Sequence, residues 1–167
     1  LVGLGVSRVR LTGGEPLLRA DLDRLVRMLV AIPGLDDLSL TSNGYLLAAQ
    51  AEKLRRAGLQ RLNISLDSLD PQVYQRLNGR DIDVARVLDG IAAAERADFG
   101  PLKLNCVVIR GVNDGSVVEL ARHFRGTPHV MRFIDYMDVG NLNRWNPEQV
   151  VPADEIIAMI DAEAPLT

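Results

Sequence analysis

Polar and apolar residues alternate in several short runs of this chain, and apolar residues at helical spacing fill the intervals between these runs. Alternation with a period of two indicates a half-buried strand, and apolar residues three or four positions apart indicate an amphipathic helix. The alternating runs predict five strands, over residues 6–12, 38–42, 62–66, 102–109 and 130–136. Repeated strand–helix units favour an α/β fold with a parallel sheet and outer helices. Without a doubly wound fingerprint, we expect a (β/α) barrel or part of one.

Capping and turn residues mark the ends of the predicted helices. Asp21 is expected to cap the first helix, and Gly58 to end the second with a positive φ. Asp70 and Pro71 are expected to open a short helix that ends near Asn78. Helix-spaced apolar residues predict three more helices, over residues 84–91, 117–124 and 156–160. No linker or internal repeat interrupts the pattern, so residues 1–167 are treated as a single domain.

Four of the predicted strands carry polar side chains on one face, although strands of parallel sheets are normally apolar on both faces. The polar set comprises Arg8, Arg10, Thr12, Ser39, Thr41, Asn43, Asn63, Ser65, Asp67, Lys103 and Asn105. A polar group buried without a partner costs about 1–3 kcal/mol, so this face must be hydrated, internally paired or filled by a polar ligand. A wide, wet barrel lumen that binds a large polar ligand is the favoured interpretation. A half-open sheet with a solvated face is the alternative.

A glycine turn follows the first predicted strand, with the sequence Gly13-Gly14-Glu15-Pro16. Adjacent glycines allow positive φ and bring backbone N–H groups close to a ligand, and Pro16 ends the strand. An acid such as Glu15 can pair with a ligand ammonium or accept hydrogen bonds from it. The same turn would also serve an ordinary strand–helix connection, and the turn alone does not decide between the two.

Two cations, Arg10 and Lys103, lie on the predicted polar face and would suit a phosphate-bearing ligand. The alternative for Lys103 is an ion pair with Asp67 or Glu15. The spacing of these residues along the chain does not distinguish a phosphate site from such a pair.

Composition narrows the classes of function. Apolar residues make up 47% and charged residues 25% of the chain, as in soluble globular proteins, and the net charge of −3 argues against a general nucleic-acid surface. No apolar run is long enough to cross a membrane. The single cysteine, Cys106, permits no internal disulfide, holds no metal cluster alone, and suits a reducing, cytoplasmic compartment. His123 and His129 show no metal-ligand spacing, so no metal ligand and no catalytic residue is assigned.

Three segments resemble the radical S-adenosylmethionine (SAM) superfamily. Gly13-Gly14-Glu15-Pro16 resembles the turn by which that superfamily binds the amino group of SAM, and segments 41–44 and 63–67 fall at the next two strand ends, as they do there. A narrower similarity to the GTP 3′,8-cyclase family (molybdenum cofactor biosynthesis protein A) rests on residues 9–19, 103–108 and 132–137. The resemblance implies a partial barrel of the radical SAM type.

The resemblance also implies ligands and chemistry. Contacts to SAM would come from Gly13, Gly14, Glu15, Ser65 and Met137, and contacts to GTP from Arg10, Thr41 and Lys103. The family uses SAM and two [4Fe–4S] clusters to convert GTP into (8S)-3′,8-cyclo-7,8-dihydroguanosine 5′-triphosphate in molybdopterin biosynthesis. A reductant for the cluster is implied, a homodimer is left open, and neither nucleic acid nor a membrane is expected as a partner.

The sequence departs from the cyclase family in its cysteines. The cluster motif Cys-x3-Cys-x2-Cys expected before Leu1, the second cysteine set expected after Thr167 and the first barrel strand are absent. We therefore expect this segment to be the middle of a radical SAM core and inactive alone, whereas its longer parent is an enzyme. The alternatives are another radical SAM enzyme of a peptide-modifying type, a non-catalytic SAM- or nucleotide-binding homologue, or an α/β scaffold with a protein partner.

Overall fold

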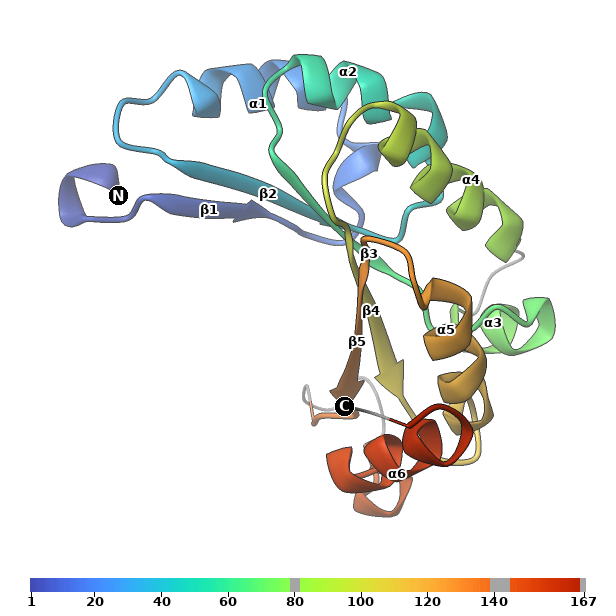
Figure 1. Cartoon of the computed structure of the whole chain (residues 1–167). Helices are drawn as coiled ribbons and strands as arrows, with labels where there is room; N and C mark the ends of the chain where they lie inside the picture. Colours follow the sequence, from blue (N-terminus) through green and yellow to red (C-terminus); the bar gives the residue numbers. More distant parts are fainter. Residues whose placement is uncertain (79–81, 139–144, 166–167) are drawn as a thin grey trace. The chain divides into compact units, whose positions relative to one another are not determined.

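The computed structural model describes residues 1–78, 82–138 and 145–165 (Figure 1). Strands and helices alternate along the chain. The residues form two compact units, which are described separately below. The first unit comprises Leu1–Ser65 with Ala85–Lys103, and the second comprises Leu66–Val84 with Leu104–Thr167.

The first unit is built on three parallel strands: β1 (Arg8–Leu11), β2 (Asp37–Ser42) and β3 (Arg61–Ser65). β2 pairs with both neighbours, and Leu40 lies opposite Leu11 on one side and Leu62 on the other. Because all three strands run in the same direction, their carboxyl ends lie at one edge of the sheet. The helices of this unit are α1 (Leu22–Val30), α2 (Ala51–Arg56) and most of α4 (Val84–Arg96), with short 3-10 turns η1 (Val2–Leu4), η2 (Pro16–Leu18) and η3 (Leu47–Ala49).

One face of this sheet forms the core of the first unit, against α1 and α2 (Figure 1). Leu38, Leu40, Leu62 and Ile64 are at most 2% exposed, as expected for the apolar set of the alternating strands. The opposite set is mixed in exposure, with Ser39 and Asn63 buried and Arg10 exposed. The alternation in the sequence therefore predicted correctly which side chains enter the core.

The second unit contains most of β4 (Lys103–Val108) and all of β5 (Val130–Asp135), which are neighbours in the sheet. Its helices are α3 (Pro71–Asn78), α5 (Val117–Phe124) and α6 (Ala153–Glu163), with the 3-10 turns η4 (Asp114–Ser116) and η5 (Pro147–Gln149). α5 packs against β5 and α6, and the side chains of Leu104, Cys106 and Leu120 are fully buried. None of the helices in the described ranges combines the length and apolar content needed to cross a membrane.

Most predicted boundaries agree with the structure within one or two residues. Gly58 has φ 102° and follows Ala57, the residue that caps the end of α2. Asp70 caps α3 because its Oδ1 accepts hydrogen bonds from the N–H groups of Gln72 at 2.7 Å and Val73 at 3.2 Å. The prediction for Asp21 was wrong. Its backbone takes a left-handed conformation with φ 53°, and its side chain makes no capping hydrogen bond to α1. Gly79, at the expected end of α3, lies outside the described residues.

Candidate functional site

The glycine turn after β1 is open on the side where a ligand could approach. A Cβ atom built on Gly13 or Gly14 would meet no atom within 4 Å. Gly13 has φ 157°, whereas Gly14 is not among the residues with positive φ. The backbone of this turn is therefore accessible, as the binding of a ligand through N–H groups requires.

Glu15 is fixed in the turn by three hydrogen bonds from the chain itself. Its Oε1 accepts from the Leu17 N–H at 2.9 Å and from the Ser42 hydroxyl at 2.8 Å, and its Oε2 accepts from the Asn43 N–H at 2.7 Å. A carboxylate can accept about four hydrogen bonds, so three of its acceptor positions are used internally. Glu15 thus holds the turn against the end of β2, a role that the sequence did not reveal.

The end of β2 is itself a rigid turn. The Ser42 hydroxyl oxygen accepts from the Gly44 N–H at 2.9 Å, and Asn43 Oδ1 accepts from the Tyr45 N–H at 3.1 Å. Gly44 has φ 75°, and a Cβ there would lie 3.0 Å from methyl carbons of Ile64 and Val87. Both its backbone conformation and its packing require glycine.

Arg10 and Lys103 line one hollow of about 30 Å³ in the first unit, together with Ser39, Arg61 and Asn63. In the described part of the chain neither Arg10 nor Lys103 forms an ion pair, whereas Arg61 pairs with Asp37. Glu15 is engaged elsewhere, which removes it as the alternative partner of Lys103. The structure thus brings together two of the three residues predicted to contact GTP.

Thr41, the third residue predicted to contact GTP, does not line this hollow but contacts Asn63, which does. Asn63 is 4% exposed, and its amide donates to Thr41 Oγ1 and to the Leu40 carbonyl, both at 3.4 Å. These long contacts leave the Thr41 hydroxyl free to donate to another acceptor. Ser39 is also buried and donates to the Val9 carbonyl at 3.4 Å. Ser39 and Asn63, the buried polar side chains of β2 and β3 on this face, are therefore paired internally, which is one of the outcomes expected from the sequence.

Ser65 and Met137, the remaining predicted SAM contacts, belong to different units. Ser65 ends β3 and is half-buried, and Met137 follows β5 with 59% of its surface exposed. Their assignment to SAM stays a prediction.

In the second unit, Asn113 connects the chain after β3 to the end of β4. Its amide nitrogen donates to the carbonyls of Asp67 and Val107, both at 2.9 Å, and its Oδ1 accepts from the Ile109 N–H at 2.7 Å. The Asp67 side chain accepts from the Val107 N–H at 2.9 Å, and burial raises the pKa of this carboxyl while the hydrogen bond partly opposes the rise. The sequence pattern placed Asp67 on the polar face but did not predict its connection to Asn113.

Cys106 is fully buried beside this cluster, with Sγ 3.6 Å from the Asp67 carbonyl oxygen. Burial, and to a smaller extent the nearby Asp67, raises the pKa of the thiol well above its usual range. A [4Fe–4S] cluster needs several thiolates, so the residues described here do not fit one.

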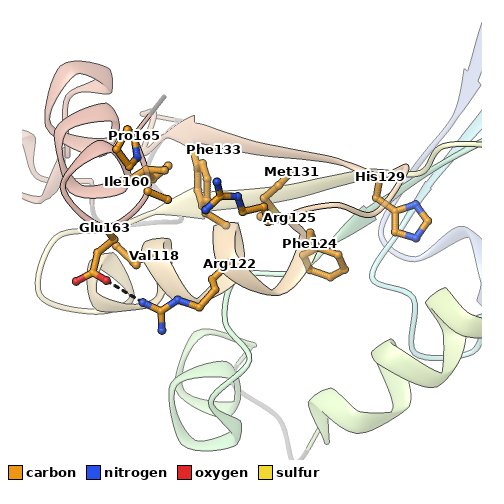
Figure 2. A pocket seen from close by; sticks show the side chains of 12 residues that line it. Val118, Arg122, Phe124, Arg125, His129, Met131, Phe133, Ile160, Glu163 and Pro165 are labelled. Atoms are coloured by element: carbon orange, nitrogen blue, oxygen red, sulfur yellow. Dashed lines mark hydrogen bonds and ion pairs between the residues drawn. The ribbon is translucent and has the colours of Figure 1, made fainter. Parts of the chain in front are cut away.

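Figure 2 shows a larger pocket of about 540 Å³ in the second unit, lined by α5, β5 and α6. Phe124, Phe133 and Ile160 make much of its wall, and Arg122 pairs with Glu163 at 2.9 Å at its edge. None of the predicted site residues lines this pocket. The size of a pocket therefore does not identify the functional site. The residues predicted to bind SAM and GTP lie outside this pocket.

Comparison with known proteins agrees with the motifs. A family model described as the radical SAM superfamily matches residues 1–124. A GTP 3′,8-cyclase from Xanthomonas axonopodis pv. citri is 54% identical over 165 residues, which cover 99% of this chain and 49% of the relative. A GTP 3′,8-cyclase from Acidothermus cellulolyticus is 57% identical over 162 residues, covering 97% of this chain and 45% of the relative. The chain thus spans about half the length of the curated relatives it matches.

Solved structures share the fold at low sequence identity. Coproporphyrinogen III oxidase (HemN) from Escherichia coli, a radical SAM enzyme, matches with a TM-score of 0.67 and 15% identity over 95% of this chain and 40% of its own. HydG, a maturase of the [FeFe]-hydrogenase, matches with a TM-score of 0.65 and 12% identity over 99% of this chain and 40% of its own. These matches confirm the predicted α/β fold of the radical SAM type.

Proposed function

Because the chain belongs to the radical SAM superfamily, we propose that it is the central part of a GTP 3′,8-cyclase. The whole enzyme would convert GTP into (8S)-3′,8-cyclo-7,8-dihydroguanosine 5′-triphosphate with SAM as the radical source. Relatives named GTP 3′,8-cyclase are 42–57% identical over nearly the whole chain. That level of identity favours this activity over a peptide-modifying radical SAM enzyme or a non-catalytic homologue.

The observation that carries the GTP part of the proposal is the hollow lined by Arg10 and Lys103. Two cations that have no carboxylate partner within the described ranges are a favourable site for a triphosphate. Thr41 contacts Asn63, which lines the same hollow, and would supply a hydroxyl. We assign these three residues to binding and orienting GTP, which lowers the barrier by holding the reacting atoms in place.

SAM would bind at the open turn of Gly13 and Gly14, with Ser65 and Met137 as further contacts. Glu15 supports this assignment indirectly, because its three hydrogen bonds fix the turn in one conformation. The iron–sulfur chemistry of the superfamily would supply the electron that cleaves SAM. We assign no cluster ligand to this segment, expect it to be inactive alone, and place the two clusters, their cysteines and the contact to a reductant in other parts of the full chain.

We further propose that the full enzyme works in the cytoplasm on these small molecules, without nucleic acid or membrane partners. A homodimer is compatible with this proposal but nothing in the chain requires it.

Titration of GTP against the full chain tests the proposal. Lys103→Ala is expected to weaken binding by about tenfold or more, because a charge-assisted contact to phosphate contributes about 1.5–3 kcal/mol. Lys53→Ala is the matched control, since Lys53 is the other lysine of the sequence and pairs with Asp23 on the surface of α2. Equal affinities of wild type and Lys103→Ala would contradict the phosphate site. Absence of 5′-deoxyadenosine after anaerobic incubation with SAM, GTP and a reductant would contradict the enzyme.

A further inference from the structure

A buried glycine lies in the interior of α4, where alanine would be the better helix former. Gly90 stands near the middle of the 13 residues of this helix. Val87 and Ala94, about one helical turn before and after it, are fully buried. Glycine is among the least favourable residues in a helix interior. Its presence here indicates that another part of the chain lies too close for a side chain.

The close neighbour of Gly90 is the backbone of the turn after β2. A Cβ atom built on Gly90 would lie 2.6 Å from the carbonyl oxygen of Gly44 and 3.1 Å from the Cβ of Leu47. The same carbonyl accepts a hydrogen bond from the Leu47 N–H at 3.0 Å, so it cannot turn aside without breaking that bond. Because α4 and the turn meet backbone to backbone, any side chain at position 90 would displace one of them.

The turn after β2 is connected in turn to Glu15. The Gly44 N–H donates to the Ser42 hydroxyl oxygen at 2.9 Å, and that hydroxyl donates to Glu15 Oε1 at 2.8 Å. The Asn43 N–H donates to Glu15 Oε2 at 2.7 Å. A shift of Gly44 would therefore move donors that hold Glu15 in the glycine turn after β1. The whole path, from Gly90 to Glu15, lies within the first unit.

We propose that Gly90 is a positioning residue for SAM binding. Without a side chain at this position, α4 supports the turn after β2, and through Ser42 and Glu15 it keeps the glycine turn in its binding conformation. The inference rests on the proposed function, which places SAM at the turn of Gly13 and Gly14. Gly90 itself contacts no ligand in this proposal.

Titration of the full chain with S-adenosylhomocysteine tests the role of Gly90. Gly90→Ala is expected to weaken this binding by about five- to tenfold, which is the effect of losing about one hydrogen bond. Its affinity for GTP is expected to stay within about twofold of wild type. The reason is that the hollow of Arg10 and Lys103 includes no residue of the displaced turn.

Ala94→Gly is the matched control on the same helix. It removes a buried methyl group and weakens α4 but adds no atom against the turn. We expect it to lower the Tm of the full chain and to leave the affinity for S-adenosylhomocysteine unchanged. A general loss of stability is thereby separated from a displacement of the turn.

A double variant with Ser42→Ala tests the path itself. If Gly90 acts through Ser42, the double variant binds S-adenosylhomocysteine about as weakly as Ser42→Ala alone, whereas independent losses would multiply. A merely structural role of Gly90 would not produce this coupling.

Three outcomes overturn the assignment of Gly90 and leave the proposed function intact. These are unchanged affinity of Gly90→Ala for S-adenosylhomocysteine, an equal loss in Ala94→Gly, and losses that multiply in the double variant. Should Gly90→Ala not fold, Ser42→Ala decides, because unchanged affinity there would break the path. Failure of the wild-type full chain to bind S-adenosylhomocysteine would instead overturn the proposed SAM site.

Discussion

The carboxylate of Glu15 accepts a hydrogen bond from the hydroxyl of Ser42 at 2.8 Å, across 27 residues of sequence. This contact joins the glycine turn after β1 to the end of the neighbouring strand β2. Since Glu15 also accepts from the backbone N–H groups of Leu17 and Asn43, a single side chain sets the relative position of two segments assigned to ligand binding. Its structural contribution can be separated from ligand contact by mutation.

Glu15→Ala is expected to lower the free energy of unfolding by about 1–3 kcal/mol, because partly buried donors lose their acceptor. Urea unfolding of the full chain measures this change. Glu52→Ala is the control, since Glu52 forms an exposed pair with Arg56 that contributes about 0–1 kcal/mol. We also expect Glu15→Ala to weaken binding of S-adenosylhomocysteine. Loss of stability without loss of affinity would show that the turn does not need Glu15 to bind SAM.

Gly44→Ala is expected to lower the stability of the fold, whereas Gly14→Ala is expected to leave it nearly unchanged. Alanine at position 44 would keep a strained φ of 75° and press on Ile64 and Val87, so it is expected to lower stability by about 1–2 kcal/mol. Alanine at position 14 meets open space and is expected to leave stability within about 0.5 kcal/mol of wild type.

The effect of Gly14→Ala should appear in ligand binding instead. Its added methyl group would project into the open space beside the turn that is proposed to bind SAM, so affinity for S-adenosylhomocysteine is expected to fall. A variant that folds normally and binds as wild type would move the SAM site away from this turn.

Asp67 should make stability depend on pH in a direction opposite to that of most carboxylates. Burial raises the pKa of Asp67, so the folded chain keeps its proton at pH values where the unfolded chain has lost it. The contribution of Asp67 to the free energy of unfolding therefore falls as the pH rises from about 4 through its raised pKa. Asp67→Asn cannot ionise and should gain stability relative to wild type over this range.

Urea unfolding at a series of pH values checks this prediction. The exposed residue Asp36 offers a matched control as Asp36→Asn. A constant difference between wild type and Asp67→Asn between about pH 4 and pH 7 would contradict the prediction.

Local pattern was sufficient to predict the strands and their core faces. Leu38, Leu40 and Leu62 are buried as their alternation requires, since period-two patterns follow directly from strand geometry. The predicted cap was correct at Asp70, whose side chain accepts a hydrogen bond from the helix that it precedes. The prediction for Asp21 was wrong: its backbone is left-handed and its side chain makes no capping hydrogen bond. Residue type alone does not determine φ.

Hydrogen bonds between residues far apart in the chain could not be predicted from the sequence. The bond from Ser42 to Glu15 and the three bonds of Asn113 depend on which strand ends meet, and a single sequence does not specify these pairings. The sequence predicted that one face of the strands is polar. Internal hydrogen bonding of that face was one of the outcomes considered. Asn105 Oδ1, the one buried side-chain oxygen without a hydrogen-bond partner among the described residues, could be identified only from the structure.

The hollow lined by Arg10 and Lys103 has a practical consequence for any binding assay. Inorganic phosphate and sulfate carry the same charge and oxygen geometry as a triphosphate terminus, so they will compete for the same two cations. Affinities measured in phosphate buffer will therefore underestimate those in a buffer of monovalent organic anions. The difference between the two buffers should shrink in Lys103→Ala, which makes buffer choice an independent probe of this site.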